Sequence, residues 1–387
     1  MLRTTKLARV VCTILVWAAS ASAQVKKQDE DLTASDGVKL KVSYFNAGKP
    51  GPGVLLLHQC NGDRHGWDGL AMDMAAAGIS VLTIDNRGFG DSGDKRFDTV
   101  TPNERAAIAQ KWPGDFDLAY AYLLSRPGVD KTEIGAGGAS CGVDNATHLA
   151  HRHPEVKTLV LLSGPADAET IAFVRSATWM PILSAAAESD GDMLPTMRWI
   201  MGFARNPQDR LLAYKGAEHG TDMFKVQKEL PTAILQWYEA KLPQPVVKDN
   251  AKNLTSVSAI EDFWDMLKKP DGAARATKMY EDAKKRDPNV FLFPESSINL
   301  LGYQRIQEGK TKEAIVVLKI NELAYPRSAN VYDSLGDAYL ADHQNELALQ
   351  YSEKALKVLA EYPAENAGGM PGVRQSAEDK IHKLKPQ

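Results

Sequence analysis

The sequence lacks several features that would point at once to a class of function. Among its 387 residues there is no run of basic residues, and Asp plus Glu (49) outnumber Lys plus Arg (46). A protein that binds nucleic acid needs clustered positive charge to neutralise phosphates, so we expect no nucleic-acid partner. His, Cys and Asp residues do not show the sequence spacing of metal ligands, so we expect no metal and no other cofactor.

A long hydrophobic run is also missing. The apolar run near the N-terminus covers residues 10–19, and it is too short to cross a bilayer, which takes about 20 residues. Three positive charges precede it and an Ala-Ser-Ala triplet ending at Ala23 follows it. This order is typical of a secretory signal peptide, predicted here as residues 1–23. Without it the net charge is −6 (43 − 49), and we expect a periplasmic or secreted protein with no membrane span.

Cysteine is scarce. Of the three cysteines, Cys12 lies within the predicted signal peptide, which leaves Cys60 and Cys141 in the mature chain. In an oxidising compartment a disulfide between two such residues could persist.

Apolar runs alternate with amphipathic runs up to residue 242, which indicates strands alternating with helices and therefore a parallel sheet covered on both faces. The expected strands are residues 39–45, 53–58, 80–86, 132–136, 158–163, 182–187 and 210–214. The expected helices are residues 67–77, 101–125, 143–153, 166–176, 193–204 and 231–241. Only 18 residues separate the fifth strand from the sixth, which leaves no room for a large lid there.

The composition changes after residue 242. We expect a first domain over 24–242, a linker over 243–256, and a helical domain over 257–387. Gly302 and Ala314 recur 34 residues later as Gly336 and Ala348. A 34-residue helix-turn-helix period is typical of tetratricopeptide repeats, although two generic helical hairpins would give a similar pattern. Such repeats often bind a peptide or protein partner, or mediate self-association.

A G-x-S-x-G pattern formed by Gly138, Ser140 and Gly142 is typical of a nucleophile elbow, in which the serine lies on a strained turn from strand to helix. A serine hydroxyl needs a base and a carboxylate that orients the base. Asp190 and His219 follow the last two expected strands, in the order Ser, Asp, His. The carboxyl ends of parallel strands meet at one edge of the sheet, so these residues could lie together. Two other acids, Asp167 and Asp192, are alternatives to Asp190.

The first part of the chain resembles the α/β-hydrolases, and their dienelactone hydrolase branch in particular. The resemblance covers roughly residues 30–242 and depends on His58 after an apolar strand, on the D-x-R-G-x-G-x-S segment over 85–92, and on the elbow. It implies a doubly wound, mostly parallel sheet and the catalytic triad Ser140, Asp190 and His219.

Dienelactone hydrolases use a cysteine nucleophile, so the neighbours Ser140 and Cys141 require a choice. The glycines flank Ser140 symmetrically, whereas Cys141 would be flanked by Ala139 and Val143, and we therefore predict Ser140 as the nucleophile. The resemblance then makes the backbone N–H groups of Cys141 and Cys60 the oxyanion hole. Two donors to one oxygen must lie close together, within reach of a disulfide, so we hypothesise a Cys60–Cys141 bridge.

Together these features predict an exported serine hydrolase that acts on a small ester or related acyl substrate. Arg64, Trp67 and Met193 are weak candidates for the walls of its site. Two alternatives stay open. The helical repeats could make this an interaction protein on an inactive hydrolase scaffold, or the same triad could cleave peptides.

Overall fold

The computed structural model describes residues 25–247, 259–363, 366 and 370–385. The predicted signal peptide and most of the predicted linker lie outside these residues. No helix in the described part of the chain is both long enough and apolar enough to cross a membrane.

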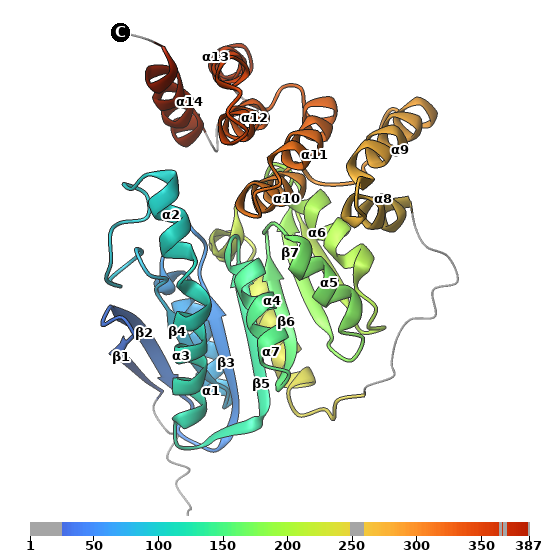
Figure 1. Ribbon diagram of the computed structural model, residues 1–387. Helices are drawn as coiled ribbons and strands as arrows, with labels where there is room; N and C mark the ends of the chain where they lie inside the picture. The colour runs from blue at the N-terminus through green and yellow to red at the C-terminus, as the bar shows by residue number, and fades with distance from the viewer. Residues whose placement is uncertain (1–24, 248–258, 364–365, 367–369, 386–387) are drawn as a thin grey trace, which may run out of the picture.

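One eight-stranded sheet forms the centre of the first domain (Figure 1). Its strands lie in the order β1-β2-β4-β3-β5-β6-β7-β8, with antiparallel pairing from β1 through β2 to β4 and parallel pairing from β4 to β8. The bounds are β1 (Lys26–Thr33), β2 (Lys39–Asn46), β3 (Gly51–Leu57), β4 (Ser80–Ile84), β5 (Val129–Ala139), β6 (Val156–Leu162), β7 (Ile182–Ala187) and β8 (Arg210–Tyr214).

The central strands are apolar because both of their faces are covered. Residues 54–57 of β3 are fully buried, as are all five residues of β4. The edge strand β1 is different. Its sequence, KKQDEDLT, is almost entirely polar and its side chains are mostly exposed, so the apolar pattern did not predict it. Backbone hydrogen bonds to β2 hold it in place.

Helices cover both faces of the sheet (Figure 1). The helices α1 and α7 contribute to the buried cluster on one face, and α3 to α6 contribute to the cluster on the other. The bounds are α1 (Asp68–Ala77), α2 (Pro102–Ala109), α3 (Trp112–Ser125), α4 (Gly142–Arg152), α5 (Ala168–Ser176), α6 (Met193–Phe203) and α7 (Glu229–Lys241), with 3-10 turns η1 (Arg64–Trp67) and η2 (Gly220–Lys225).

The single helix expected over 101–125 is two helices in the structure. Thr101 caps α2 with a capping box, and α2 ends at Ala109. Pro113 lies in the first turn of α3. A proline has no N–H to continue the hydrogen-bond ladder of a preceding helix, but it is well tolerated in a first turn, so the chain stops one helix and starts another here.

The second domain is entirely helical in its described residues. Its bounds are α8 (Ala259–Lys268), α9 (Gly272–Arg286), α10 (Glu295–Gln307), α11 (Thr311–Ala324), α12 (Ala329–Ala341), α13 (Asn345–Glu361) and α14 (Met370–Leu384). The starts of α10 and α12 are 34 residues apart, and so are those of α11 and α13. The paired glycines lie at helix contacts, because a Cβ on Gly302 would come within 2.5 Å of the Leu318 side chain and one on Gly336 within 2.9 Å of Ser352.

The helical domain packs on the carboxyl edge of the sheet, above α4 to α6 (Figure 1). The indole N–H of Trp199 on α6 donates to the carbonyl of Leu292 at 2.9 Å, and its ring meets the Trp264 ring edge to face at 5.2 Å. Ser297 on α10 donates to the carbonyl of Ala166 at 2.7 Å. One buried apolar cluster runs from the sheet through α5 and α6 into α8 to α11, so the two domains share a core.

Candidate active site

The turn between β5 and α4 has the geometry of a nucleophile elbow. Ser140 has a φ of 52°, a left-handed conformation that non-glycine residues rarely adopt and that costs energy. A Cβ on Gly138 would lie 1.8 Å from the carbonyl oxygen of Gly142, and one on Gly142 would lie 2.6 Å from that of Leu57. Both positions therefore require glycine. The strain falls on Ser140 and not on Cys141, whose φ of −55° is ordinary.

A histidine and a carboxylate meet at the same edge of the sheet. His219 follows β8, Asp190 follows β7, and Nδ1 of His219 lies 2.9 and 3.1 Å from the two carboxylate oxygens of Asp190. The side chains are 27% and 12% exposed respectively, so the pair is partly shielded from water. A carboxylate on Nδ1 leaves Nε2 free to act on a proton. Within the described residues no hydrogen bond joins the Ser140 hydroxyl to His219.

The two alternative acids are placed differently. The Asp167 carboxylate accepts a hydrogen bond from the Thr170 N–H at 2.8 Å and lies 3.1 Å from Nε2 of His148, so it caps α5. Asp192 makes no hydrogen bond to His219 in the described part of the chain, and burial raises the pKa of its carboxyl. Of the three acids considered from the sequence, Asp190 is the one whose carboxylate lies against the His219 ring.

The loop after β3 is tied to the elbow by a disulfide. Cys60 and Cys141 are bonded, with a Cα–Cα distance of 5.8 Å. The bridge crosses 81 residues of sequence and joins the ends of β3 and β5, which are neighbours in the sheet. It ties the loop after β3 to the residue that directly follows Ser140.

His58 fixes the course of the same loop. Its Nε2 accepts a hydrogen bond from the Asn86 N–H at 2.8 Å. A backbone N–H can only donate, so Nδ1 carries the proton and donates to the Gln59 carbonyl, 2.7 Å away. Burial lowers the pKa of His58, which keeps the ring neutral in this role.

Gln59, which the sequence analysis does not name, joins two loops of the site. Its side-chain oxygen accepts hydrogen bonds from the Thr221 N–H and hydroxyl at 2.9 and 3.1 Å, and its amide donates to Asp222 at 3.3 Å. Gly220 comes so close that a Cβ there would lie 2.3 Å from the same oxygen. The side chain thus links the loop after β3 to the loop that carries His219. The one sequence signal for this role is a polar Gln directly after His58, where an apolar strand ends.

Comparison with known proteins bears on the fold of the first domain. Residues 52–219 match a family model described as the alpha/beta hydrolase fold. The first domain has the α/β-hydrolase fold. Two uncharacterized proteins from two strains of Mycobacterium tuberculosis are 30% identical over 157 residues, which is 40% of this chain and 51% of theirs. The chain thus spans about half the length of the curated relatives it matches.

Several solved structures are similar in fold to the α/β-hydrolase domain. The Pyrococcus furiosus esterase Pf2001 has a TM-score of 0.46 and 17% identity, over 61% of this chain and 96% of that one. Est1E from Butyrivibrio proteoclasticus, solved with ferulic acid, has a TM-score of 0.47 and 16% identity, over 56% and 100%. A cold-adapted esterase from an Arctic intertidal metagenomic library has a TM-score of 0.47 and 17% identity, over 59% and 100%.

Two of the three residues suggested as walls of the site have other roles in the α/β-hydrolase domain. The guanidinium of Arg64 is 3% exposed and binds Asp85, Asp91 and Ser43. Trp67 is 0% exposed and belongs to the apolar cluster beneath α1 and α7. Neither offers a surface to a substrate. Met193 is partly exposed and lines a cavity beside Asp192.

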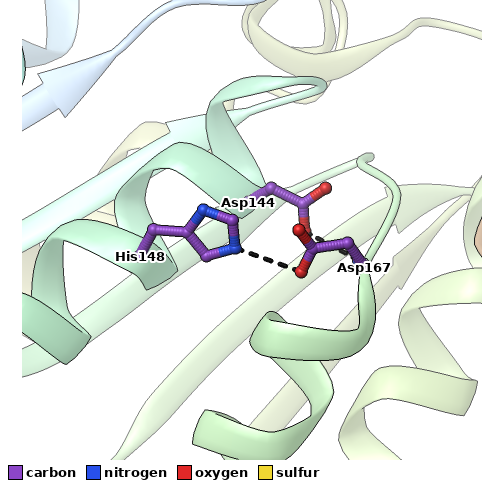
Figure 2. A group of neighbouring side chains, drawn as sticks. All are labelled: Asp144, His148 and Asp167. Atoms are coloured by element: carbon purple, nitrogen blue, oxygen red, sulfur yellow. Dashed lines mark hydrogen bonds and ion pairs between the residues drawn. The ribbon is translucent and has the colours of Figure 1, made fainter. Parts of the chain in front are cut away.

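A second cluster of ionisable side chains lies behind the elbow. Asp144 and His148 on α4 and Asp167 before α5 each offer a ligand atom within 4.8 Å of the others (Figure 2). The sequence analysis expected no metal because it found no ligand spacing, and it did not predict this cluster, whose third member lies on a separate loop. Groups of the protein already form hydrogen bonds to this cluster. One Asp144 carboxylate oxygen accepts from the Asp167 N–H at 3.0 Å and from the Thr170 hydroxyl at 2.6 Å.

The cluster titrates in an unusual range. Burial, together with the neighbouring Asp167 carboxylate, raises the pKa of Asp144 to about 7. Burial opposes charge on His148, but the hydrogen bond and charge of Asp167 outweigh it, so the pKa of His148 is raised. The same contact keeps the pKa of Asp167 below its ordinary value in spite of burial. The hydrogen bonds between Asp144, His148 and Asp167 hold the 163–167 loop against α4, the helix that starts after the Ser140 turn.

Proposed function

We propose that this protein is an exported serine hydrolase that cleaves an ester or a related acyl bond. Ser140 attacks the carbonyl carbon while His219 takes the hydroxyl proton at Nε2. His219 then gives that proton to the leaving oxygen as the acyl–oxygen bond breaks, which leaves an ester on Ser140. Water, deprotonated by the same histidine, hydrolyses this acyl-enzyme and restores the serine.

The contact between Asp190 and Nδ1 of His219 carries the proposal. It sets the tautomer that leaves Nε2 unprotonated, and it stabilises the imidazolium that forms when the serine proton is taken. The strained backbone of Ser140 between two obligatory glycines supports the same assignment. The N–H groups of Cys60 and Cys141 are the proposed oxyanion donors, held in place by their disulfide.

The finer parts of the proposal have separate support. The dienelactone hydrolase resemblance favours small esters or lactones. The 34-residue offset between α10 and α12 supports tetratricopeptide-like repeats in the second domain. The N-terminal charge and apolar pattern and the Cys60–Cys141 disulfide support export, because such bonds are rare in a reducing cytosol.

A fluorophosphonate probe tests the nucleophile directly. The wild-type protein should be labelled, and Ser140→Ala should not. Ser189→Ala is the matched control, because this exposed serine adjoins Asp190 and its side chain has no proposed role. Labelling that persists in Ser140→Ala would disprove the assignment. An unlabelled but folded wild-type protein would favour the alternative of an interaction protein on an inactive scaffold.

A further inference from the structure

Two neighbouring cavities lie between the α/β-hydrolase domain and the helical domain. The first, of about 360 Å³, is lined by Asp192 and Met193 from one domain and by Glu295 and Asn330 from the other. The second, of about 670 Å³, lies between the 98–105 segment and helices α10, α12 and α14. Asn330 lines both, so the two spaces adjoin.

The first cavity is next to the proposed catalytic residues. Pro165 lines it, and the preceding Gly164 lies so close to the elbow that a Cβ there would be 2.3 Å from the Ser140 carbonyl oxygen. On its other side, Met193 donates its N–H to the Asp190 carbonyl at 2.9 Å. The loop that packs against the elbow and the loop that carries Asp190 therefore form one wall of this cavity. The start of α10 forms the opposite wall.

The lining of both cavities is acidic. The first contains Asp192 and Glu295 and no basic residue. The second contains four aspartates and a single arginine, and Lys380 pairs with two of the aspartates, Asp333 and Asp337. Arg96 lies 3.9 Å from Asp98, so the excess of negative charge is clearest in the first cavity, whose two carboxyl groups face no basic lining residue.

The carboxyl groups of the first cavity have no cationic partner within the described residues. The Asn330 amide donates to the Glu295 carboxylate at 2.9 Å, which fixes its position. Burial raises the pKa of Glu295, and the charge of Asp192 raises it further. Burial also raises the pKa of Asp192. A positive group between them would relieve both effects.

Two further polar atoms of this cavity lack a partner. The Ser296 hydroxyl and the Asn299 side-chain oxygen are shielded from solvent and form no hydrogen bond in the described part of the chain. Both residues line the same cavity. A shielded acceptor that lacks a donor lowers the stability of the folded protein, because it has lost its hydrogen bonds to water. These atoms, together with the two carboxyl groups, indicate a ligand that brings N–H donors.

We infer that this cavity is a substrate subsite, and that it selects acyl substrates carrying a primary ammonium group. The inference rests on the proposed hydrolase function. An ammonium offers three N–H donors and one positive charge, which match the fixed carboxylate of Glu295, the carboxylate of Asp192 and the Asn299 oxygen. The helical domain would then contribute to specificity as half of the binding site.

Pairs of esters that differ only in charge test this inference. On the acyl side, p-nitrophenyl 6-aminohexanoate is compared with p-nitrophenyl heptanoate. On the alcohol side, 4-aminobutyl butyrate is compared with pentyl butyrate. In at least one pair we expect kcat/KM for the ammonium ester to exceed that for the neutral ester by about tenfold, and by less as salt is raised.

The variants locate the effect. Glu295→Gln combined with Asp192→Asn should lower the preference to about twofold or less, while both side chains can still accept hydrogen bonds. Asp73→Asn, which removes an exposed charge on α1, is the control and should keep the wild-type preference. Circular dichroism and fluorophosphonate labelling of each variant establish that it is folded and has a reactive serine.

The outcomes separate the two proposals. A wild-type protein that the probe does not label refutes the hydrolase function itself. A labelled protein that shows no preference in either pair, or that fails to turn over the ammonium esters, refutes the subsite alone. The subsite is also refuted if the labelled double variant keeps the wild-type ratio of kcat/KM between ammonium and neutral esters.

Discussion

The disulfide between Cys60 and Cys141 should stabilise both the α/β-hydrolase domain and the proposed oxyanion site. In the chain-entropy model, a bridge that spans 81 residues removes enough freedom from the unfolded chain to contribute about 4.5 kcal/mol at 25 °C. Measured values more often lie at about 2–4 kcal/mol. For a domain of about 200 residues, each kcal/mol shifts Tm by about 2–4 °C. We therefore expect Tm to fall by about 5–15 °C when the bridge is removed.

The effect on catalysis has a separate cause. Loss of one oxyanion donor typically lowers kcat by about 10²–10³-fold. Removal of the bridge loosens the two proposed donors but keeps both N–H groups, so we expect a smaller loss, about tenfold in kcat, with less change in KM.

Thermal unfolding and ester hydrolysis measure the two effects in parallel. The samples are the wild-type protein with and without dithiothreitol and the Cys60→Ser Cys141→Ser double variant. Dithiothreitol should lower Tm and kcat of the wild type and leave the double variant unchanged. Thiol labelling after denaturation counts the free cysteines in each sample. The reasoning fails if the untreated mature protein shows two free thiols, or if full reduction changes neither Tm nor kcat.

Two further predictions concern the acidic residues. Asp190→Asn should lower kcat by about 10³–10⁴-fold through loss of the orienting carboxylate. Asp167→Asn, measured in the same assay, should affect stability more than kcat. Equal losses in kcat would contradict the assignment of Asp190 as the acid. The folded-state pKa of Asp144 is raised from 3.8 to about 7, and that of His148 is raised above 6.5, so the folded protein binds more protons at these two groups than the unfolded chain does. The contribution of these two groups to stability should therefore fall as the pH rises from about 4 to 7, and His148 should extend the fall above its ordinary pKa. Asp144→Asn should flatten this decline in Tm measured against pH, and an unchanged slope would exclude Asp144 as a source.

The sheet and the turn that carries Ser140 could be predicted because local patterns determine them. Buried parallel strands read as apolar runs, and the elbow needs two glycines at fixed spacing, so both leave marks in the sequence. The edge strand β1 leaves none, because its stability comes from hydrogen bonds to β2 and its side chains face water. Pro113 does indicate the break between α2 and α3, but the amphipathic pattern continues across it, so a single helix was expected there.

The roles of Arg64 and Trp67 could not be predicted, since they depend on partners far apart in the chain. Asp85 and Asp91 reach Arg64 only because β4 lies beside β3 in the sheet. The same holds for Gln59, whose partner Thr221 is 162 residues away. The cavity beside Asp192 depends on how the helical domain is placed against α6, and nothing in either domain's own sequence pattern fixes that placement.

The shared core also limits how the role of the helical domain can be tested. Trp199 and Trp264 are almost fully buried against each other across the domain boundary, and Phe263 and Phe293 are buried in the same cluster. Burial of one such side chain contributes about 1.5–3 kcal/mol, so separating the domains would expose apolar surface on both. A truncated protein that lost activity would therefore report misfolding as readily as a lost subsite. Substitutions confined to the cavity lining, such as Glu295→Gln, leave this core intact, and they are the changes that can distinguish a substrate-binding role of the helical domain from a purely structural one.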